Sequence, residues 1–454
     1  MTMNDKRPVI VGGGIAGLSA GLMLCEQGLR PILLESTDSF GGLLRSEIRS
    51  PFGAFDIGSH VVSETGIAEL DQLLFDHIDP DEYCLHESLP NGTYFNGVSS
   101  GSGFIDTRAL TPELYEKGLS DFFQTDPVEF DPDSTAMECA AKRYGATFTD
   151  EIIAPVLERL FGEGVQELNS RALSLVGLRR LLVGEATEAL KWKQESAWND
   201  ERMCFHSVKP GNAALRHYYS KKGGVGKWVL DTVEKLKACG ADLLPSTKVA
   251  RISLEDGEVV QISLSNGEQV ACNQLVWCAP VYPIFGLTGQ EAPSDLQPPR
   301  LCAMAITDLV LSEPSPLSYT YLTCHDPKFQ TFRVTNYQAM EQQMSAVQKE
   351  GYRFTIEEMR PPSVSHSPSD VSQLFDELCA LGIANPKSSI VQSWQGHISN
   401  GFPVPTSRFV TDSLTMAQSA LDLIGNLKIV GRGSGRVFFT SEVLVDLYNQ
   451  LSAE

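Results

Sequence analysis

The first residues whose spacing could do chemistry are glycines near the N-terminus. Gly12, Gly14 and Gly17 form the pattern G-x-G-x-x-G between a short apolar run and a stretch with helical periodicity. In such a turn Gly12 allows the tight bend, Gly14 lets a diphosphate approach the backbone, and Gly17 allows the helix to pack closely on the strand. The amides of Ile15 and Ala16 then open a helix whose positive dipole end favours phosphate. The pattern predicts that these residues bind a dinucleotide.

A carboxylate follows at the position where the ribose of such a ligand would lie. Glu35 ends a second apolar run, 18 residues after Gly17, and Ser36 adjoins it. A carboxylate at this position can accept hydrogen bonds from both ribose hydroxyls, and its negative charge disfavours the 2′-phosphate of NADP. The two apolar runs and the helical stretch between them make one β-α-β unit of about 30 residues.

Elements of the nucleotide-binding type recur in separated parts of the chain. The expected elements are a helix over 225–239, alternating strands over 247–254, 259–264 and 269–271 with Asp-Gly and Asn-Gly turns between them, buried strands over 274–280 and 426–431, and a final helix over 442–451. We therefore predict a nucleotide-binding domain formed by 1–75, 216–290 and 396–454, and a second domain formed by 76–215 and 291–395.

The amino-acid composition limits the classes of molecule that this protein is expected to bind. Asp plus Glu is 57 against 36 Lys plus Arg, so the formal net charge is -21. This charge argues against nucleic acid or an anionic membrane as the main partner, although a local basic pocket for an anionic substrate is compatible with it.

The sequence has no apolar run of about 18 residues, which a membrane span would need, and no signal-peptide pattern. The 10 cysteines form no C-x-x-C pair, which is typical of reduced thiols in a cytoplasmic protein. No histidine pair has metal-ligand spacing, so we expect no metal.

A second glycine motif indicates which dinucleotide is expected. The segment G-G-L-L-R begins six residues after Glu35. It resembles the second glycine motif of the FAD-dependent amine-oxidase clan, which includes protoporphyrinogen oxidases, phytoene desaturases and UDP-galactopyranose mutases. In that clan the glycine pair approaches the pyrophosphate and the ribityl chain, and the arginine adds charge. The resemblance implies that Gly41, Gly42, Leu43 and Arg45 bind FAD. An exposed glycine turn is the alternative.

Further stretches resemble the clan in the same order along the chain. F-D-I-G-S-H resembles the segment that passes the flavin ring, T-K-V the strand whose valine meets adenine, and C-A-P a strand end near the pyrophosphate. A Gly-Arg pair and an acid ten residues after its arginine resemble the C-terminal segment that meets the flavin and the ribityl chain. The FAD-binding residues that this resemblance adds are Gly58, Ser59, His60, Val249, Ala279, Pro280, Gly431, Arg432 and Glu442.

His60 is the titratable residue that we place beside the flavin ring. There it could donate a hydrogen bond to the flavin or act as an acid or base near neutral pH, with a plain structural role as the alternative. The neighbouring Asp56 is interpreted as structural. The strand expected over 301–311 contains no lysine of the kind that contacts the flavin in many amine oxidases. The C-terminal region also lacks the cysteine that attaches flavin in some of them, so we expect non-covalent FAD.

The sequence motifs indicate the substrate less clearly than they indicate the cofactor. The segment F-R-V-T is similar to the one that supplies a pyrophosphate-binding arginine in the sugar mutases. This similarity makes Arg333 a candidate catalytic residue, together with His60. F-P-V-P-T at 402–406 resembles their Y-P-x-P segment, whereas Phe161 stands where they usually have tryptophan. These matches favour an anionic or sugar-linked small molecule.

The block from Arg171 to Arg180 could also contribute an active-site arginine on a mobile segment. A surface or structural ion-pair role is the alternative for Arg333, and a solvated helix face is the alternative for Arg179 and Arg180.

The resemblance implies an α/β fold, with a Rossmann-like FAD-binding domain of the GR2 type and a discontinuous, mixed α+β substrate domain. It implies an FAD-dependent oxidoreductase that passes hydride from an organic small molecule to flavin. A non-redox, flavin-dependent nucleotide-sugar mutase is the second hypothesis. A flavoprotein fold kept as a non-catalytic binding subunit is the third. An oligomer is compatible with all of them.

Overall fold

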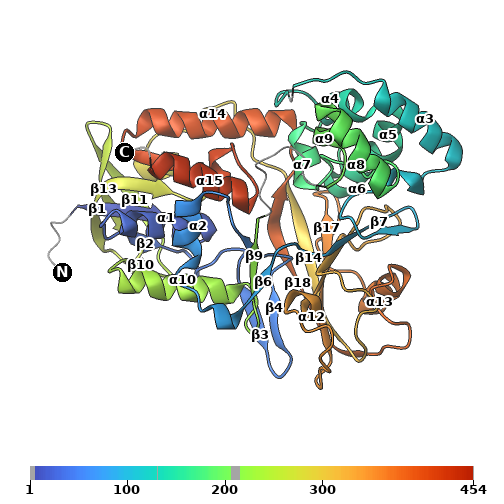
Figure 1. The fold of residues 1–454 in the computed structure, drawn as a ribbon. Helices are drawn as coiled ribbons and strands as arrows, with labels where there is room; N and C mark the ends of the chain where they lie inside the picture. The colour runs from blue at the N-terminus through green and yellow to red at the C-terminus, as the bar shows by residue number, and fades with distance from the viewer. Residues whose placement is uncertain (1–5, 130, 206–214, 453–454) are drawn as a thin grey trace.

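The computed structural model describes residues 6–129, 131–205 and 215–452. The chain forms two large sheets that lie side by side, with helices around the first and a lobe of helices beside the second (Figure 1). Segments far apart in the sequence build each sheet. The site must therefore be assembled from several parts of the chain.

The first sheet has a parallel centre. Its strands are β1 (Arg7–Val11), β2 (Ile32–Leu34), β10 (Asp242–Leu244), β11 (Val249–Glu255), β12 (Glu258–Leu264), β13 (Gln269–Trp277) and β19 (Leu427–Ile429). The order is β10-β2-β1-β13-β12-β11, with β19 also pairing β13. Strands β10, β2, β1, β13 and β19 are parallel, and β11 and β12 extend β13 as an antiparallel meander. The carboxyl ends of the parallel strands share one edge, which is where ligands bind in such sheets.

Helix α1 is packed on nearly every side. All residues from Ala16 to Leu24 are buried, because α1 contacts the sheet, α10 and α15. A Cβ atom on Gly21 would lie 3.0 Å from the Leu236 side chain, so the small residue lets α10 approach. The helices of this part of the molecule are α1 (Ile15–Glu26), α2 (Ala68–Phe75), α10 (Gly226–Ala238), α11 (Pro283–Thr288), α14 (Ser407–Leu423) and α15 (Thr440–Leu451).

Two boundaries differ from the sequence-based expectation. The strands expected over 269–271 and 274–280 are one continuous strand, β13, because its first half pairs with β12 and its second half with β1. Helix α15 begins at Thr440 rather than at 442, because the Glu442 carboxylate accepts the backbone N–H of Phe439 and extends the first turn. The Asp-Gly and Asn-Gly turns between β11, β12 and β13 lie where they were predicted.

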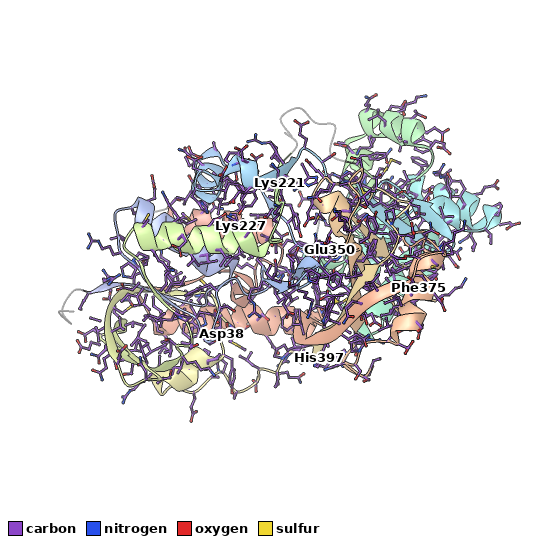
Figure 2. All side chains as sticks on the ribbon, turned by 90° about the horizontal axis from the view of Figure 1, so that it is seen from below. Asp38, Lys221, Lys227, Glu350, Phe375 and His397 are labelled. Atoms are coloured by element: carbon purple, nitrogen blue, oxygen red, sulfur yellow. The ribbon has the colours of Figure 1, made fainter. Side chains whose placement is uncertain are left out.

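The second sheet is mixed and has the order β18-β14-β17-β16-β15-β7-β8. Its strands are β7 (Asn91–Phe95), β8 (Val98–Ser100), β14 (Leu301–Leu311), β15 (Tyr321–Cys324), β16 (Arg333–Asn336), β17 (Tyr352–Arg360) and β18 (Ile390–Pro403), with α12 (Tyr337–Met340) and α13 (Val371–Ala380) beside them. Leu374 and Leu378 of α13 join the apolar cluster of this sheet. In the view from below, Phe375 of α13 lies at the opposite end of the molecule from Asp38, which lies near the first sheet (Figure 2). Strand β18 crosses the proposed domain boundary at 395/396, so that boundary stays a proposal.

A helical lobe and two small sheets complete the fold. The lobe contains α3 (Pro112–Phe123), α4 (Ala136–Tyr144), α5 (Ala146–Phe148), a π-helical turn (Thr149–Ile153), α6 (Ala154–Phe161), α7 (Arg171–Leu175), α8 (Ala186–Glu195) and α9 (Ala197–Arg202). The small sheets consist of β3 (Ser46–Arg49) with β4 (Gly53–Asp56), and of β9 (His217–Ser220) between β5 (Val62–Ser63) and β6 (Tyr83–His86). In the part of the chain that the structure describes, no helix combines the length and apolar character needed to cross a bilayer.

Candidate functional site

The glycine turn after β1 has room for a ligand at one position only. Gly12 has φ +105°, and a Cβ atom there would lie 3.1 Å from the carbonyl oxygen of Cys278. A Cβ atom on Gly17 would collide with the carbonyl oxygen of Gly12. A Cβ atom on Gly14, in contrast, would meet no atom within 4 Å. Two of the glycines are thus required by packing, and the third faces open space.

The start of α1 can hold an anion at this open space. Gly14 is its N-cap, no side chain caps the helix, and its first turn contains no acidic residue. The first amides of a helix lack intrahelical partners and carry the positive end of its dipole. These uncapped amides and the open space at Gly14 fit a diphosphate.

Glu35 lies at the carboxyl end of β2, beside the glycine turn. It is buried, and its two carboxylate oxygens accept the backbone N–H of Gly13 at 2.8 Å and of Thr37 at 2.7 Å. The Ser36 hydroxyl also donates to it, at 3.2 Å. Its backbone carbonyl accepts the N–H of Thr247 at 2.8 Å, which brings the start of β11, with Val249, to the same edge. The carboxylate is therefore fixed where the ribose was predicted.

The second glycine motif packs against the first. The N–H of Gly41 donates to the carbonyl of Gly13 at 2.7 Å, and Gly14 and Gly41 form a parallel β-bridge. A Cβ atom on Gly42 would lie 3.3 Å from the Cα of Gly14. Arg45 is half-exposed and donates to the carbonyl of Gly42 at 2.9 Å. The segment predicted by resemblance therefore borders the open space, with a cation at its end.

The C-terminal residues approach the same helix end. A Cβ atom on Gly431 would lie 3.2 Å from the Cβ of Ala16. The carbonyl of Cys278, next to Ala279 and Pro280, closes against Gly12. Glu442 stands in the first turn of α15 and accepts the backbone N–H groups of Phe438 and Phe439, both at 3.1 Å. In this structure its carboxylate caps the helix.

The segment with Ser59 is held to the second sheet by a buried carboxylate. Glu357 of β17 is 2% exposed, and its Oε1 accepts the N–H of Ser59 at 2.9 Å. Arg333 of β16 donates through Nε to Oε1 at 2.8 Å and through Nη2 to Oε2 at 2.7 Å. The hydroxyls of Ser59 and Thr335 are 2.6 Å apart. One carboxylate thus fixes both the predicted flavin-facing segment and the candidate arginine.

The charges around this carboxylate act on His60. Burial, followed by repulsion from Arg333, lowers the pKa of His60 to about 4, although the Glu357 carboxylate opposes this shift. Burial alone would raise the pKa of Glu357, but Arg333 outweighs it and holds that pKa below its usual range. At neutral pH the histidine is therefore neutral, beside an ionised Arg–Glu pair. A neutral imidazole can donate one hydrogen bond and accept another.

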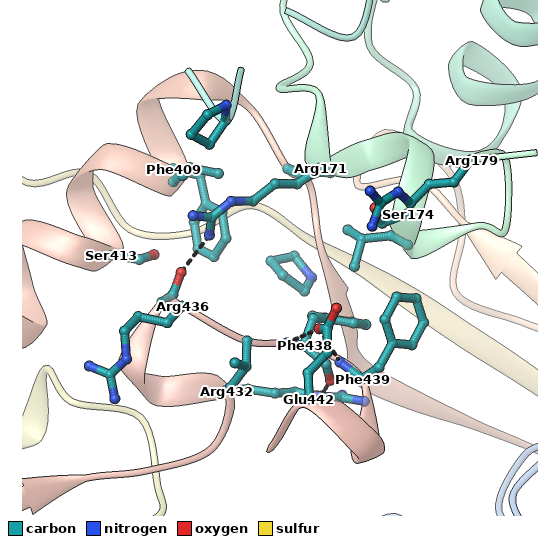
Figure 3. A pocket seen from close by; sticks show the side chains of 17 residues that line it. Arg171, Ser174, Arg179, Phe409, Ser413, Arg432, Arg436, Phe438, Phe439 and Glu442 are labelled. Carbon is teal, nitrogen blue, oxygen red and sulfur yellow. Dashed lines mark hydrogen bonds between the residues drawn. The ribbon is translucent and has the colours of Figure 1, made fainter. Parts of the chain in front are cut away.

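A pocket of about 300 Å³ opens between the helical lobe and the C-terminal segment. In Figure 3 Arg171 and Arg179 enter it from one side, while Arg432, Phe438, Phe439 and Glu442 lie on the other. The Arg171 Nη1 donates to the carbonyl of Gly435 at 2.6 Å. The Arg432 guanidinium stacks on Phe438 at 4.2 Å. The remaining lining residues are Pro132, Ser174, Leu175, Pro403, Pro405, Phe409, Val410, Ser413, Gly435, Arg436 and Val437.

Comparisons with known proteins agree with this arrangement. The family model described as an NAD(P)-binding Rossmann-like domain matches residues 10–74. A reduced UDP-galactopyranose mutase has a TM-score of 0.73 at 16% identity, over 99% of this chain and 93% of that chain. A protein of Exiguobacterium sp. 255-15 named as a protoporphyrinogen oxidase has a TM-score of 0.66 at 14% identity, over 99% of both chains. Cyclohexylamine oxidase from Brevibacterium oxydans IH-35A has a TM-score of 0.59 at 14% identity, over 99% of this chain and 100% of that chain.

The chain has the fold of the FAD-dependent amine-oxidase clan. In sequence, human flavin-containing monooxygenase 5 is 35% identical over 82 residues, which are 18% of this chain and 15% of the human protein. That similarity is short, whereas the structural similarity runs through both sheets and the helical lobe. The α/β fold class is confirmed, and the fold is the one that the resemblance to the clan predicted.

Within the amine-oxidase-clan fold, the two arginines after α7 differ from the expectation of a solvated helix face. Helix α7 ends at Leu175, so neither Arg179 nor Arg180 is helical. Arg180 is half-buried and donates through Nη1 to the carbonyls of Asp200, Met203 and Phe205. Arg179 is exposed and lines the pocket. Folding of the lobe, rather than helical periodicity, places these side chains.

Sequence reasoning missed Glu357 as a site residue, whereas Arg171 begins the block from which an active-site arginine was expected. Glu357 is one of two adjacent glutamates in β17, and nothing in its local sequence distinguishes it from Glu358, which pairs with Arg360. The interpretation of Arg333 as part of an ion pair agrees with its contacts, and its side chain remains 23% exposed.

Asp56 is a structural residue of this fold, and its protonation should affect stability. It accepts hydrogen bonds from Ser46 at 2.6 Å, Tyr219 at 2.7 Å and the N–H of Val225 at 3.0 Å. Burial raises the pKa of Asp56 to about 6, although these hydrogen bonds oppose the shift. A raised pKa in the folded state favours the protonated form, so its contribution to stability falls as the pH rises toward and past 6.

We therefore expect Asp56→Asn to gain stability relative to the wild type as the pH rises. Because asparagine does not ionise, its free energy of unfolding minus that of the wild type should increase by roughly 1 kcal/mol between pH 5.5 and pH 7.5. Urea denaturation at the two pH values measures this difference. A constant difference would show that Asp56 is ionised throughout the range.

Proposed function

We propose that this protein is an FAD-dependent oxidoreductase that takes hydride from a small organic molecule carrying an anionic group. The observation that carries the proposal is the open space at Gly14, bordered by uncapped helix amides, the fixed Glu35 carboxylate and the second glycine motif. A dinucleotide's diphosphate and ribose need these groups. The likeness of the fold to flavin enzymes supports FAD as the dinucleotide.

The bound flavin would supply the hydride acceptor, and the chain's residues would position the substrate and exclude water. The C-terminal segment from Gly431 to Glu442 would border the ribityl chain and the ring, with no covalent bond. Ser59 and His60 would pass the ring from the side of the second sheet. His60 is held neutral there, so it can donate or accept one hydrogen bond at neutral pH.

The pocket indicates the class of substrate. Arg171, Arg179 and Arg432 bring positive charge to it, and Phe409, Phe438 and Phe439 contribute aromatic walls. Arginine side chains bind carboxylate and phosphate groups with a favourable fork geometry. No tyrosine lines this pocket among the described residues. We infer that the substrate is an organic anion with an apolar body, bound by its charge at the arginines.

The cofactor proposal is tested by titration of the apoprotein. FAD should quench the intrinsic fluorescence with a dissociation constant at least about 100-fold below that of NAD⁺ or NADP⁺. Tight binding of NAD⁺ without FAD binding would overturn the proposal. The reaction is tested by mixing the FAD-loaded protein without oxygen with a panel of aromatic and aliphatic organic acids, where bleaching of the flavin absorbance supports hydride transfer.

A non-redox sugar mutase is a second candidate, because the structure resembles UDP-galactopyranose mutase with a TM-score of 0.73. Its diphosphate substrate would also suit the arginines of the pocket. The same anaerobic experiment separates the two candidates. Rearrangement of a nucleotide sugar only after dithionite reduction, without bleaching by any acid, would support the mutase.

Arg171 should contribute to substrate binding without affecting the cofactor. Replacing Arg171 with Gln removes a charged donor, so the dissociation constant of a bound organic acid should rise about 10-fold or more, while FAD affinity stays unchanged. Arg436→Gln is a matched control: Arg436 also borders the pocket, but its guanidinium points away from it in Figure 3 and pairs with Asp446. Equal effects of the two substitutions on acid binding would exclude a specific role for Arg171.

A further inference from the structure

Two cysteines lie at the ends of neighbouring helices beside the first sheet. Cys25 stands in the last turn of α1, and Cys239 directly follows α10 as its C-cap. Helix α1 leads into β2 and α10 leads into β10, and these two strands are paired and parallel. Because each helix returns against the direction of the strand that it enters, α1 and α10 run in roughly the same direction. The two helices are in contact, so their last turns lie next to each other.

The contact one turn before the two cysteines is very close. A Cβ atom on Gly21 would lie 3.0 Å from the side chain of Leu236, so the missing side chain lets the helices approach. Cys25 is four residues after Gly21, and Cys239 is three residues after Leu236. Residues three and four apart lie on the same face of a helix. Cys25 and Cys239 therefore continue the same contact face by one turn.

The segments that follow the two helices also stay together. The N–H of Asp242 donates to the carbonyl of Pro31 at 3.0 Å. A Cβ atom on Gly240 would lie 3.6 Å from the side chain of Arg30. The two cysteines are thus held between a close helix contact on one side and a backbone hydrogen bond on the other. Neither helix end can move away from its neighbour without breaking one of these contacts.

The two thiols act on each other. Both are free thiols, and both are half-buried, so a small molecule can reach them from solvent. Burial, followed by the charge of Cys239 and a hydrogen bond with its thiol, raises the pKa of Cys25 to about 11, although Lys235 opposes the shift. The hydrogen bond agrees with the position that the helix contacts give the two side chains. The sulfur atoms therefore face each other, which is the arrangement that a disulfide bond needs.

We propose that Cys25 and Cys239 form a reversible oxidation site, at which a hydroperoxide joins α1 to α10 through a disulfide bond. Disulfides of proteins in reducing compartments are usually redox-responsive rather than structural. The bond would close a long loop that contains the whole helical lobe. Because it involves neither the dinucleotide turn nor the pocket, this proposal goes beyond the proposed function and does not depend on it.

The atoms and electrons of the step balance with hydrogen peroxide as the oxidant. The nucleophile is a thiolate, and the raised pKa of Cys25 keeps that thiol protonated at neutral pH, so Cys239 attacks first. Its sulfur bonds to one peroxide oxygen, the O–O bond breaks, and a sulfenic acid and water form. The Cys25 sulfur then loses its proton, attacks the sulfenic sulfur and releases a second water. Two thiols are oxidised to one disulfide, and one peroxide is reduced to two waters.

The test is peptide mapping of the intact chain after treatment with hydrogen peroxide and without a reducing agent. Trypsin leaves Cys25 and Cys239 in separate peptides that contain no other cysteine, so their disulfide gives a cross-linked peptide of unique mass. We expect this peptide to form and dithiothreitol to split it. We also expect oxidation to raise the melting temperature by about 2–5 °C, because the bond restricts the unfolded chain.

Cys25→Ser and Cys239→Ser should each lose both the cross-linked peptide and the rise in melting temperature. Cys379→Ser is the matched control, since Cys379 is also half-buried but lies on α13 beside the second sheet. It should behave like the wild type. Sulfinic or sulfonic acid at either cysteine without a cross-link would overturn the proposal. A cross-link that forms only in urea, or only between two molecules on a non-reducing gel, would overturn it as well.

Discussion

Replacing Gly14 with alanine should weaken FAD binding at least about 100-fold while changing the stability of the apoprotein by less than about 1 kcal/mol. Gly14 has φ -75°, which alanine adopts without strain, and its Cβ would meet no protein atom within 4 Å. The methyl group would instead occupy the space where the diphosphate must approach the backbone. Fluorescence titration with FAD and thermal unfolding of the apoprotein measure the two effects.

Gly17→Ala is the matched control for this prediction. It adds the same methyl group three residues later, where it would collide with the carbonyl oxygen of Gly12. The backbone of the turn must then move, so we expect a loss of several kcal/mol in stability, as in other overpacked sites. Gly14→Ala that binds FAD like the wild type would show that no diphosphate lies against this turn.

Replacing Glu357 with alanine should destabilise the protein by about 3 kcal/mol, because it leaves Arg333 without its partner and the N–H of Ser59 without its acceptor. The segment with Ser59 and His60 would also lose its attachment to the second sheet, so we expect weaker flavin binding. Urea denaturation gives the change in the free energy of unfolding, and FAD titration gives the effect on the cofactor.

A double-mutant cycle distinguishes an ion pair from general packing damage. Removing both charges with Glu357→Ala and Arg333→Leu leaves no unpaired cation, so the double variant should recover about 1–3 kcal/mol relative to the sum of the single changes. Additive effects would show that the pair is not coupled. Glu357→Gln retains the shape of the side chain and should fall between the wild type and the alanine variant.

The nucleotide half of the site could be predicted because its signals are local. The order of Gly12, Gly14 and Gly17 between a strand and a helix requires a tight turn, and the next strand must end near Glu35. The Asp-Gly and Asn-Gly turns between β11, β12 and β13 could also be predicted from local sequence. These features depend on residues within about 30 positions of one another, so the spacing of residues in the sequence is enough to predict them.

The substrate side could not be predicted in this way. Arg333 and Glu357 are 24 residues apart and meet only because β16 and β17 pair in the second sheet. Arg171 and Gly435 are 264 residues apart. In the structure Glu442 caps α15, and its predicted contact with the ribityl chain remains a prediction. The positions of the FAD-binding residues as a set remain a prediction.

By itself, the sequence determined the β-α-β unit and the place of its glycine turn, because glycine conformations and strand–helix–strand spacing are properties of short segments. The tertiary structure decided that His60 is held neutral, that Arg333 is paired, and that Arg171 and Arg179 of the helical lobe line a pocket with the C-terminal segment. These properties arise from burial and from charges on distant strands and helices. They exist only once the chain has brought those elements together.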